Sequence, residues 1–139
     1  MDTRRSEFVL LQPRSRHTPK GYTHGVVVPR GGRMVFVAGQ LASNQDGVIT
    51  SRDFVAQFAT CLDNVIAIVK EANGRPESIA QLTIYITDFD AYRRHKQALA
   101  VAWHARFADF YPAIEIVSVK ELIDRDAMVE IGGIACLPE

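Results

Sequence analysis

The polar residue of this 139-residue chain that is best suited to catalysis is Glu130, which interrupts an apolar run from Ala127 to Ile134. Such a run predicts a β-strand whose neighbours lie in a core. A carboxylate partly removed from water beside a subunit interface is suited to general acid or base catalysis. An edge-strand glutamate facing water, or one held in a structural ion pair, produces the same pattern, so both interpretations stay open.

Other familiar catalytic patterns are missing. The sequence contains no phosphate-binding glycine loop, no nucleophile elbow, and no paired-histidine or paired-cysteine metal motif. The four histidines are dispersed, and we therefore expect neither a metal nor a cofactor. Cys61, Trp103 and Phe107 fall on apolar helical stripes, which favours core positions for all three.

The composition is that of a globular domain, with 47% apolar and 23% charged residues. Sixteen basic residues balance 16 acidic ones, which argues against a dedicated nucleic-acid binder. No stretch has the length of a membrane span and the N-terminus lacks a signal-peptide pattern, so we expect a cytoplasmic protein. Residues 1–35 carry seven basic and two acidic groups. We divide the chain into a basic arm, 1–17, and one domain, 18–139.

The spacing of apolar residues predicts an α+β fold in the order β-β-α-β-α-β-β, with two helices on one mixed sheet. The Gly31-Gly32 turn suggests that the first two strands of this order form a hairpin. A further short edge strand is expected before them, at 7–11. The strands are expected at 25–28, 34–39, 82–87, 114–119 and 128–137, and the helices at 51–72 and 92–110.

Helix boundaries are also marked in the sequence. Thr50 or Ser51 is the expected N-cap of the first helix, and Asn73 followed by glycine is the expected stop. Asp88 or Asp90 is expected to cap the second helix.

Two helices on one side leave the other face of the sheet open. The segments 34–38 and 114–119 place apolar residues on both faces, and a monomer rarely exposes an apolar area of that size. We therefore expect a closed homo-oligomer.

Several short motifs, in order and at similar spacing, resemble the RidA/YjgF family of small trimeric proteins. The resemblance covers about residues 18–137. It rests on Gly21-Tyr22-Thr23-His24-Gly25-Val26, Met34-Val35-Phe36-Val37-Ala38-Gly39-Gln40, Leu62-Asp63-Asn64-Val65, Tyr111-Pro112-Ala113, Val129-Glu130-Ile131 and Ile134-Ala135.

The resemblance implies a chorismate-mutase-like fold, assembled as a homotrimeric barrel with three inter-subunit clefts. It implies hydrolysis of reactive imino or enamine acids to keto acids and ammonia. The family glutamate corresponds to Glu130 and the family tyrosine to Tyr22, the two expected catalytic residues. The family Gly-Gln pair corresponds to Gly39 and Gln40, of which Gly39 is expected to contact the substrate.

Three departures from the family alter the expected substrate-binding residues. The carboxylate-binding arginine is replaced by Ile114, a cysteine or threonine by Ile116, and a serine by Ala38. Losing a bidentate charge-assisted contact costs on the order of 1.5–3 kcal/mol. A more apolar ligand is therefore expected, with His24 as an additional polar group. The sequence leaves open whether Arg30, Arg33 or another subunit supplies a replacement cation.

Three functions remain as hypotheses at this point. The first is a divergent RidA-like deaminase acting on an imine, an enamine or a related small metabolite. The second is a trimer that binds a small metabolite without turnover. The third, and weakest, is an endoribonuclease or translation inhibitor, which only the basic arm supports.

Overall fold

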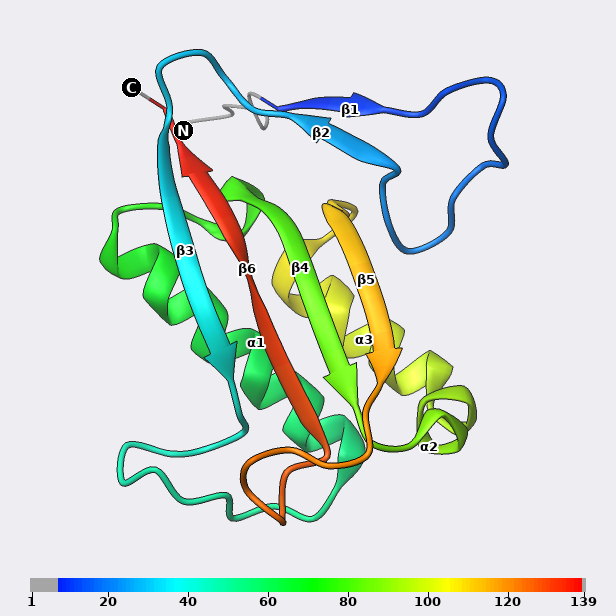
Figure 1. Ribbon diagram of the computed structural model, residues 1–139, viewed down its shortest axis with the longest axis vertical. Helices are drawn as coiled ribbons and strands as arrows, with labels where there is room; N and C mark the ends of the chain where they lie inside the picture. Colours follow the sequence, from blue (N-terminus) through cyan, green and yellow to red (C-terminus); the bar gives the residue numbers. More distant parts are fainter. Residues whose placement is uncertain (1–7, 139) are drawn as a thin grey trace.

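The helices within residues 8–138 lie on one face of a four-stranded sheet, and a separate two-stranded sheet lies at one end (Figure 1). The computed structural model describes residues 8–138. Part of the expected basic arm, including Arg4 and Arg5, lies outside the described residues. Within residues 8–138, no helix has both the length and the apolar character that crossing a membrane requires.

The main sheet has the strand order β3-β6-β4-β5. Its strands are β3 (Arg33–Gln40), β4 (Ile79–Ile86), β5 (Ala113–Ser118) and β6 (Val129–Leu137). β4 and β5 pair in parallel, whereas β6 is antiparallel to both β3 and β4. The expected mixed sheet is therefore confirmed, with β3 and β5 at its edges.

The expected second helix is divided in two. α2 (Phe89–Arg94) and α3 (Lys96–Phe107) are separated at His95, whose Nδ1 lies 2.7 Å from the Ala91 carbonyl oxygen. In a continuous helix that oxygen would accept the backbone N–H of His95. The N–H bonds to the Tyr92 oxygen instead, so a side chain that competes for the Ala91 carbonyl accounts for the break.

The first helix, α1 (Phe54–Glu71), begins later than expected. Its N-cap is Asp53, whose carboxylate accepts the N–H of Ala56 at 2.8 Å. The prediction of Thr50 or Ser51 is wrong, since the Ser51 hydroxyl accepts the N–H of Asp53 in the preceding turn. The stop at Asn73 is confirmed, with φ of 64°. Asp88 is confirmed as the N-cap of α2.

The expected hairpin between the segments 25–28 and 34–39 is wrong. β2 (Gly25–Val27) pairs instead with β1 (Val9–Leu11), within the edge strand expected at 7–11. The Gly31-Gly32 turn lets the chain pass from this small sheet into the main one. The β1–β2 hairpin carries a long connecting loop, residues 12–24, that projects beyond β5 (Figure 1).

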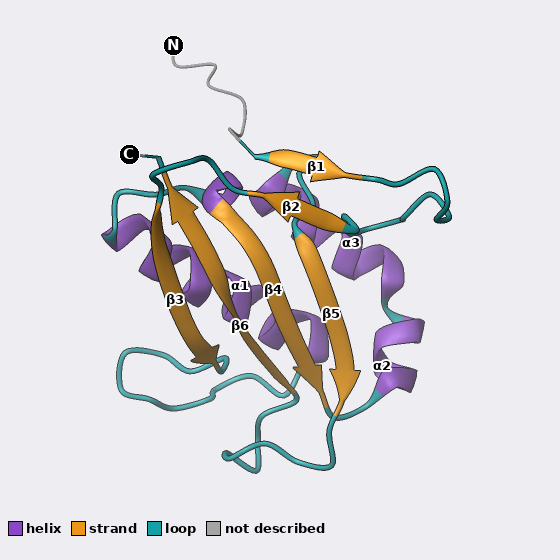
Figure 2. Ribbon diagram, turned by 45° about the horizontal axis from the view of Figure 1, so that its top comes forward, coloured by secondary structure: helices purple, strands orange, loops and turns teal. Residues whose placement is uncertain are grey.

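The core lies between the main sheet and the helices (Figure 2). From β4 it receives Leu82, Ile84 and Ile86, each no more than 1% exposed. Trp103 and Phe107 are buried, as expected, and their rings stack with centroids 4.2 Å apart. The helices cover this face of the sheet. A short 3-10 turn (Pro76–Ser78) leads into β4.

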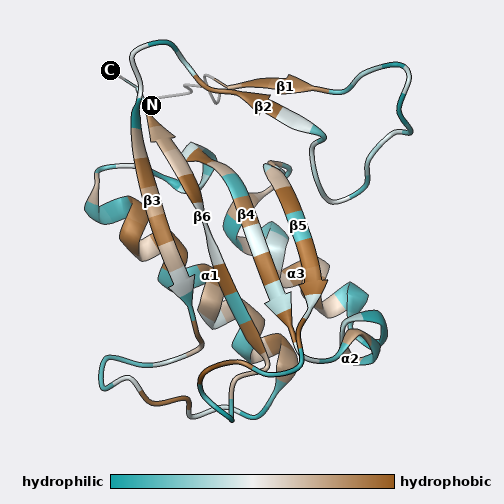
Figure 3. Cartoon of the chain, viewed as in Figure 1, coloured by the Kyte–Doolittle hydropathy of each residue, from teal (hydrophilic) through white to brown (hydrophobic). Residues whose placement is uncertain are grey.

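The opposite face of the sheet is open and partly apolar. On β3, Phe36 is 75% exposed and Met34 is 46% exposed, and on β5 Val117 is 41% exposed. Figure 3 shows apolar residues along β3 and a hydrophilic band on each of β4, β5 and β6. The open apolar face expected from the sequence is therefore present, with a polar centre.

The capping geometry at α1 yields a stability prediction. We expect Asp53→Ala to lower the free energy of unfolding by about 1 kcal/mol, because it removes the acceptor for a helix N–H. Urea denaturation measures the difference. Asp46→Ala is the matched control, since Asp46 lies in an exposed turn and its carboxylate makes no hydrogen bond to residues 8–138. Equal losses in both variants would contradict the assignment.

Candidate functional site

Glu130 lies on the open face of the sheet, near its centre. It pairs with Tyr85 across β4 and β6, and paired residues of neighbouring strands project to the same face. Next to it Gly132 pairs with Thr83. The side-chain alternation along β4 explains this placement, because Gln81, Thr83 and Tyr85 alternate with the buried residues of the same strand.

A bulge in β3 brings Gly39 directly onto Glu130. The register of β3 with β6 shifts between Val37 and Gln40. A Cβ atom built on Gly39 would lie 2.7 Å from the carboxylate carbon of Glu130, which is too close for any side chain. Because the contacted atoms are the end of the flexible Glu130 side chain, a larger residue at position 39 would displace the carboxylate, and glycine lets it lie against β3.

The carboxylate of Glu130 is partly buried and has no partner in the described part of the chain. No hydrogen bond or ion pair joins it to residues 8–138. It borders a depression of about 330 Å³, the sheet depression, which Gln81, Thr83 and Tyr85 also line. The Gln81 amide donates to the Thr83 hydroxyl at 2.8 Å. A free carboxylate in such a depression can accept a proton from water or bind a donor of a ligand.

Tyr22 and His24 lie at the outer edge of the sheet, beside β5. Thr23 between them holds the segment there, since its N–H bonds to the Pro112 oxygen and its hydroxyl donates to the Tyr111 oxygen at 2.6 Å. Tyr22 and His24 line a second pocket of about 150 Å³, the edge pocket. Gln81 borders both pockets, but Tyr22 and Glu130 do not line a common one.

The ring of Tyr22 is packed in a cluster with two histidines. The His17 Nε2 lies 2.7 Å from the Tyr22 hydroxyl, and the His24 Nε2 lies 2.8 Å from the His17 carbonyl oxygen. The Tyr22 and His24 rings meet edge to face, with centroids 5.4 Å apart. One ring nitrogen of His24 is thus occupied in holding the loop.

Ile114 and Ile116 lie on the helix-covered side of the sheet. They pair with Leu82 and Ile84 of β4 and pack against the hydrophobic core. Ile114 also borders the edge pocket. Within one chain, the structure therefore does not bring these two residues to Glu130. Ala38 is exposed in the β3 bulge beside Gly39.

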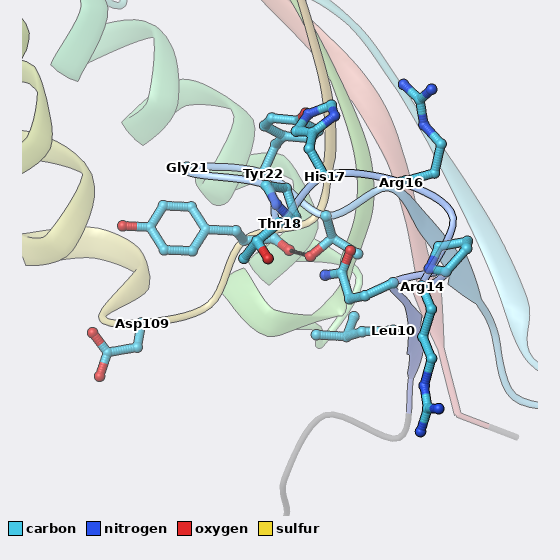
Figure 4. A pocket seen from close by; sticks show the side chains of 13 residues that line it. Leu10, Arg14, Arg16, His17, Thr18, Gly21, Tyr22 and Asp109 are labelled. Atoms are coloured by element: carbon cyan, nitrogen blue, oxygen red, sulfur yellow. Dashed lines mark hydrogen bonds between the residues drawn. The ribbon is translucent and has the colours of Figure 1, made fainter.

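Two sets of residues near these sites were not predicted from the sequence. One is the polar row of β4, for which the alternation of Thr83 and Tyr85 with apolar neighbours was the available signal. The other surrounds Tyr22 in the loop of the β1–β2 hairpin. This hairpin pocket, of about 570 Å³, is shown in Figure 4, and its lining residues are Leu10, Gln12, Pro13, Arg14, Arg16, His17, Thr18, Pro19, Gly21, Tyr22, Thr23, Asp109 and Tyr111.

The two arginines considered as replacement cations lie elsewhere. Arg30 is in the turn after β2 and Arg33 begins β3, where it pairs with Leu137. Neither lines the sheet depression, the edge pocket or the hairpin pocket. In residues 8–138, no three His, Cys, Asp or Glu side chains gather as a metal-binding group.

Comparison with known proteins identifies a family and several relatives of this chain. The family model described as Endoribonuclease L-PSP matches residues 14–137. A RutC family protein from Aquifex aeolicus is 34% identical over 103 residues, which cover 73% of this chain and 78% of the relative. A RutC family protein from Pyrococcus abyssi is 27% identical over 105 residues, covering 75% and 79%.

Solved structures share the fold. The Rid family protein YyfB from Yersinia pestis superposes with a TM-score of 0.83 at 24% identity, covering 94% of this chain and 98% of its own. The YjgF gene product of E. coli has a TM-score of 0.66 at 29% identity, covering 85% and 88%. E. coli TdcF, solved with bound serine, has a TM-score of 0.66 at 29% identity, covering 94% and 98%.

Cys61 is a core thiol, as expected, and supplies a prediction about reactivity. It is 0% exposed, and burial, reinforced by the Glu130 carboxylate, raises the pKa of its thiol to about 12. Because only the thiolate reacts, iodoacetamide at pH 8 should leave Cys61 unmodified in the native protein and alkylate it after unfolding. Peptide mass spectrometry reads the outcome. Rapid native labelling at pH 8 would contradict the buried placement.

Proposed function

Because this chain belongs to the endoribonuclease L-PSP family, the family of the RidA and YjgF proteins, we propose that it is a divergent RidA-like hydrolase. Its substrate is a reactive imine, enamine or related small metabolite. The observation that carries the proposal is the partly buried, unpartnered carboxylate of Glu130, seated on Gly39 at the sheet depression. The serine bound to TdcF supports a ligand of amino-acid size.

The proposed working unit is a homotrimer in which the copies cover one another's open faces. Phe36 and Met34 supply exposed apolar surface beside the sheet depression. Burying such surface contributes roughly 25 cal/mol for each Å². In this arrangement the edge pocket, with Tyr22 and His24, meets the Glu130 depression of a neighbouring copy. Ile114 and Ala38 then border the cleft, and Ile116 stiffens its wall from within the core.

The proposed reaction needs few groups. Glu130 accepts a proton from a water molecule as the water oxygen adds to the imine carbon. The proton passes to nitrogen and gives a carbinolamine. The hydroxyl proton of this intermediate then moves to the same nitrogen through Glu130, the C–N bond breaks, and ammonia leaves as the carbonyl forms. Tyr22 orients the substrate through its hydroxyl. The net change adds one water and releases a keto product and ammonia, with Glu130 returned to its starting form.

The substrate is proposed to be more apolar than that of the parent family. Position 114 offers an isoleucine where the resemblance implies an arginine, and its side chain packs against the core. A small imino acid such as 2-iminobutyrate would lack its bidentate partner there. The non-catalytic binder stays as the alternative, and an endoribonuclease has only the family description and the basic arm in its favour.

A kinetic comparison tests the role of Glu130. The imines are generated in situ from aliphatic and aromatic amino acids by an amino-acid oxidase, and ammonia release is followed with and without the protein. We expect acceleration that favours the aromatic imine, and a loss of about 100-fold or more in Glu130→Gln. Glu71→Gln, an exposed change at the end of α1, should keep full activity.

Absence of acceleration for every imine would favour the non-catalytic binder. Unchanged turnover in Glu130→Gln would remove the proposed base from the mechanism.

A second experiment tests the assembly. We expect the native protein to sediment as a trimer at micromolar concentration and Phe36→Lys to sediment as a smaller species, because the charge would be buried between copies. Val101→Lys is the matched control, since Val101 is 72% exposed on α3, away from the open face. A native monomer, or dissociation of both variants alike, would contradict the proposed interface.

A further inference from the structure

The loop of the β1–β2 hairpin concentrates positive charge around a pocket. Residues 8–24 contain Arg14, Arg16 and Lys20 and no acidic residue. Arg14 and Arg16 line the hairpin pocket, and neither forms an ion pair with residues 8–138. Two unpaired guanidinium groups at one pocket produce a positive potential that attracts anions.

Positive and negative side chains lie on opposite sides of this pocket (Figure 4). Figure 4 shows Arg14 and Arg16 on one side of the pocket, with their guanidinium groups extending outward and away from each other, and Asp109 on the opposite side. An anionic ligand therefore meets attraction on the arginine side and repulsion on the Asp109 side. This arrangement orients a ligand that carries its charge at one end.

The interior of the hairpin pocket suits an organic body. Leu10, Pro19, Tyr22 and Tyr111 contribute apolar or aromatic surface, and Thr18 adds a hydroxyl. The volume of about 570 Å³ falls in the range of small-molecule sites. His17 holds the Tyr22 hydroxyl at 2.7 Å, so one wall of the pocket is fixed before a ligand arrives.

We propose that the hairpin pocket binds an organic carboxylate, with its apolar body against Tyr22 and Tyr111 and its carboxylate on Arg14 and Arg16. The guanidinium groups are exposed and form no ion pair within residues 8–138, so they can turn toward a bound carboxylate and form planar, bidentate hydrogen bonds. The binding itself needs only one chain. That the bound carboxylate is the substrate of the Glu130 site rests on the proposed function.

Arg14 and Arg16 supply a positive charge that strand β5 lacks. Ile114 leaves the family's arginine position without charge, whereas Arg14 and Arg16 line a pocket that includes the same Tyr22. The carboxylate contact is then relocated from the sheet to the hairpin loop. Arg30 and Arg33, the cations that the sequence suggested, take no part.

A binding experiment on the full-length protein tests the proposal without requiring turnover. Benzoate, its neutral isostere benzamide, and inorganic phosphate are each titrated into ¹⁵N-labelled protein. We expect benzoate to shift the amide signals of Gly21 and Tyr22, and benzamide and phosphate to bind at least about ten-fold more weakly. The double variant Arg14→Gln/Arg16→Gln should weaken benzoate by a similar factor.

Arg30→Gln is the matched control, because Arg30 is exposed and lies outside the hairpin pocket. Equal binding of benzoate and benzamide, phosphate binding as strong as benzoate, or full benzoate affinity in the double variant would each overturn the proposal. A lack of imine hydrolysis would leave these readouts unaffected, so the failure of the proposed function is distinguishable from the failure of this inference.

Discussion

The structure depends on one constraint, which is that the helices in the described part of the chain lie on the same face of the main sheet (Figure 2). That packing buries the apolar residues of α1, β4 and β6 in a single core. It also leaves the opposite face with Phe36 and Met34 exposed around the carboxylate of Glu130. The surface that favours association and the residue suited to catalysis are therefore consequences of the same one-sided arrangement.

Elements with strong local signals could be predicted from the sequence. The three- and four-residue spacing of apolar residues indicated α1, and the alternation around Ile84 indicated β4. Details that depend on competition between neighbouring polar groups could not be predicted from the sequence. Asp53 caps α1 because Ser51 is engaged in the preceding turn, and His95 divides α2 from α3 by bonding to the Ala91 carbonyl. β2 pairs with β1 across the long loop at 12–24, and no turn residue in the sequence marks this pairing.

The candidate site was predictable in part. A lone carboxylate in an apolar strand pointed to Glu130, and its fit over Gly39 depends on a bulge that the sequence does not mark. Ile114 and Ile116 share one strand face, as alternation requires, but pairing with β4 decides that this is the helix-covered face. Arg14 and Arg16 belong to no motif, and only the folded loop brings them around Tyr22.

The central claim is that Tyr22 of one copy and Glu130 of another form one working cleft. Subunit complementation tests it directly, by unfolding Tyr22→Ala and Glu130→Gln together in equal amounts and refolding them as a mixture. If neighbouring copies share the cleft, the mixture contains sites with both native residues and should regain about a quarter of the native imine hydrolysis. Activity no greater than that of the two variants refolded separately would show that each chain carries its site alone.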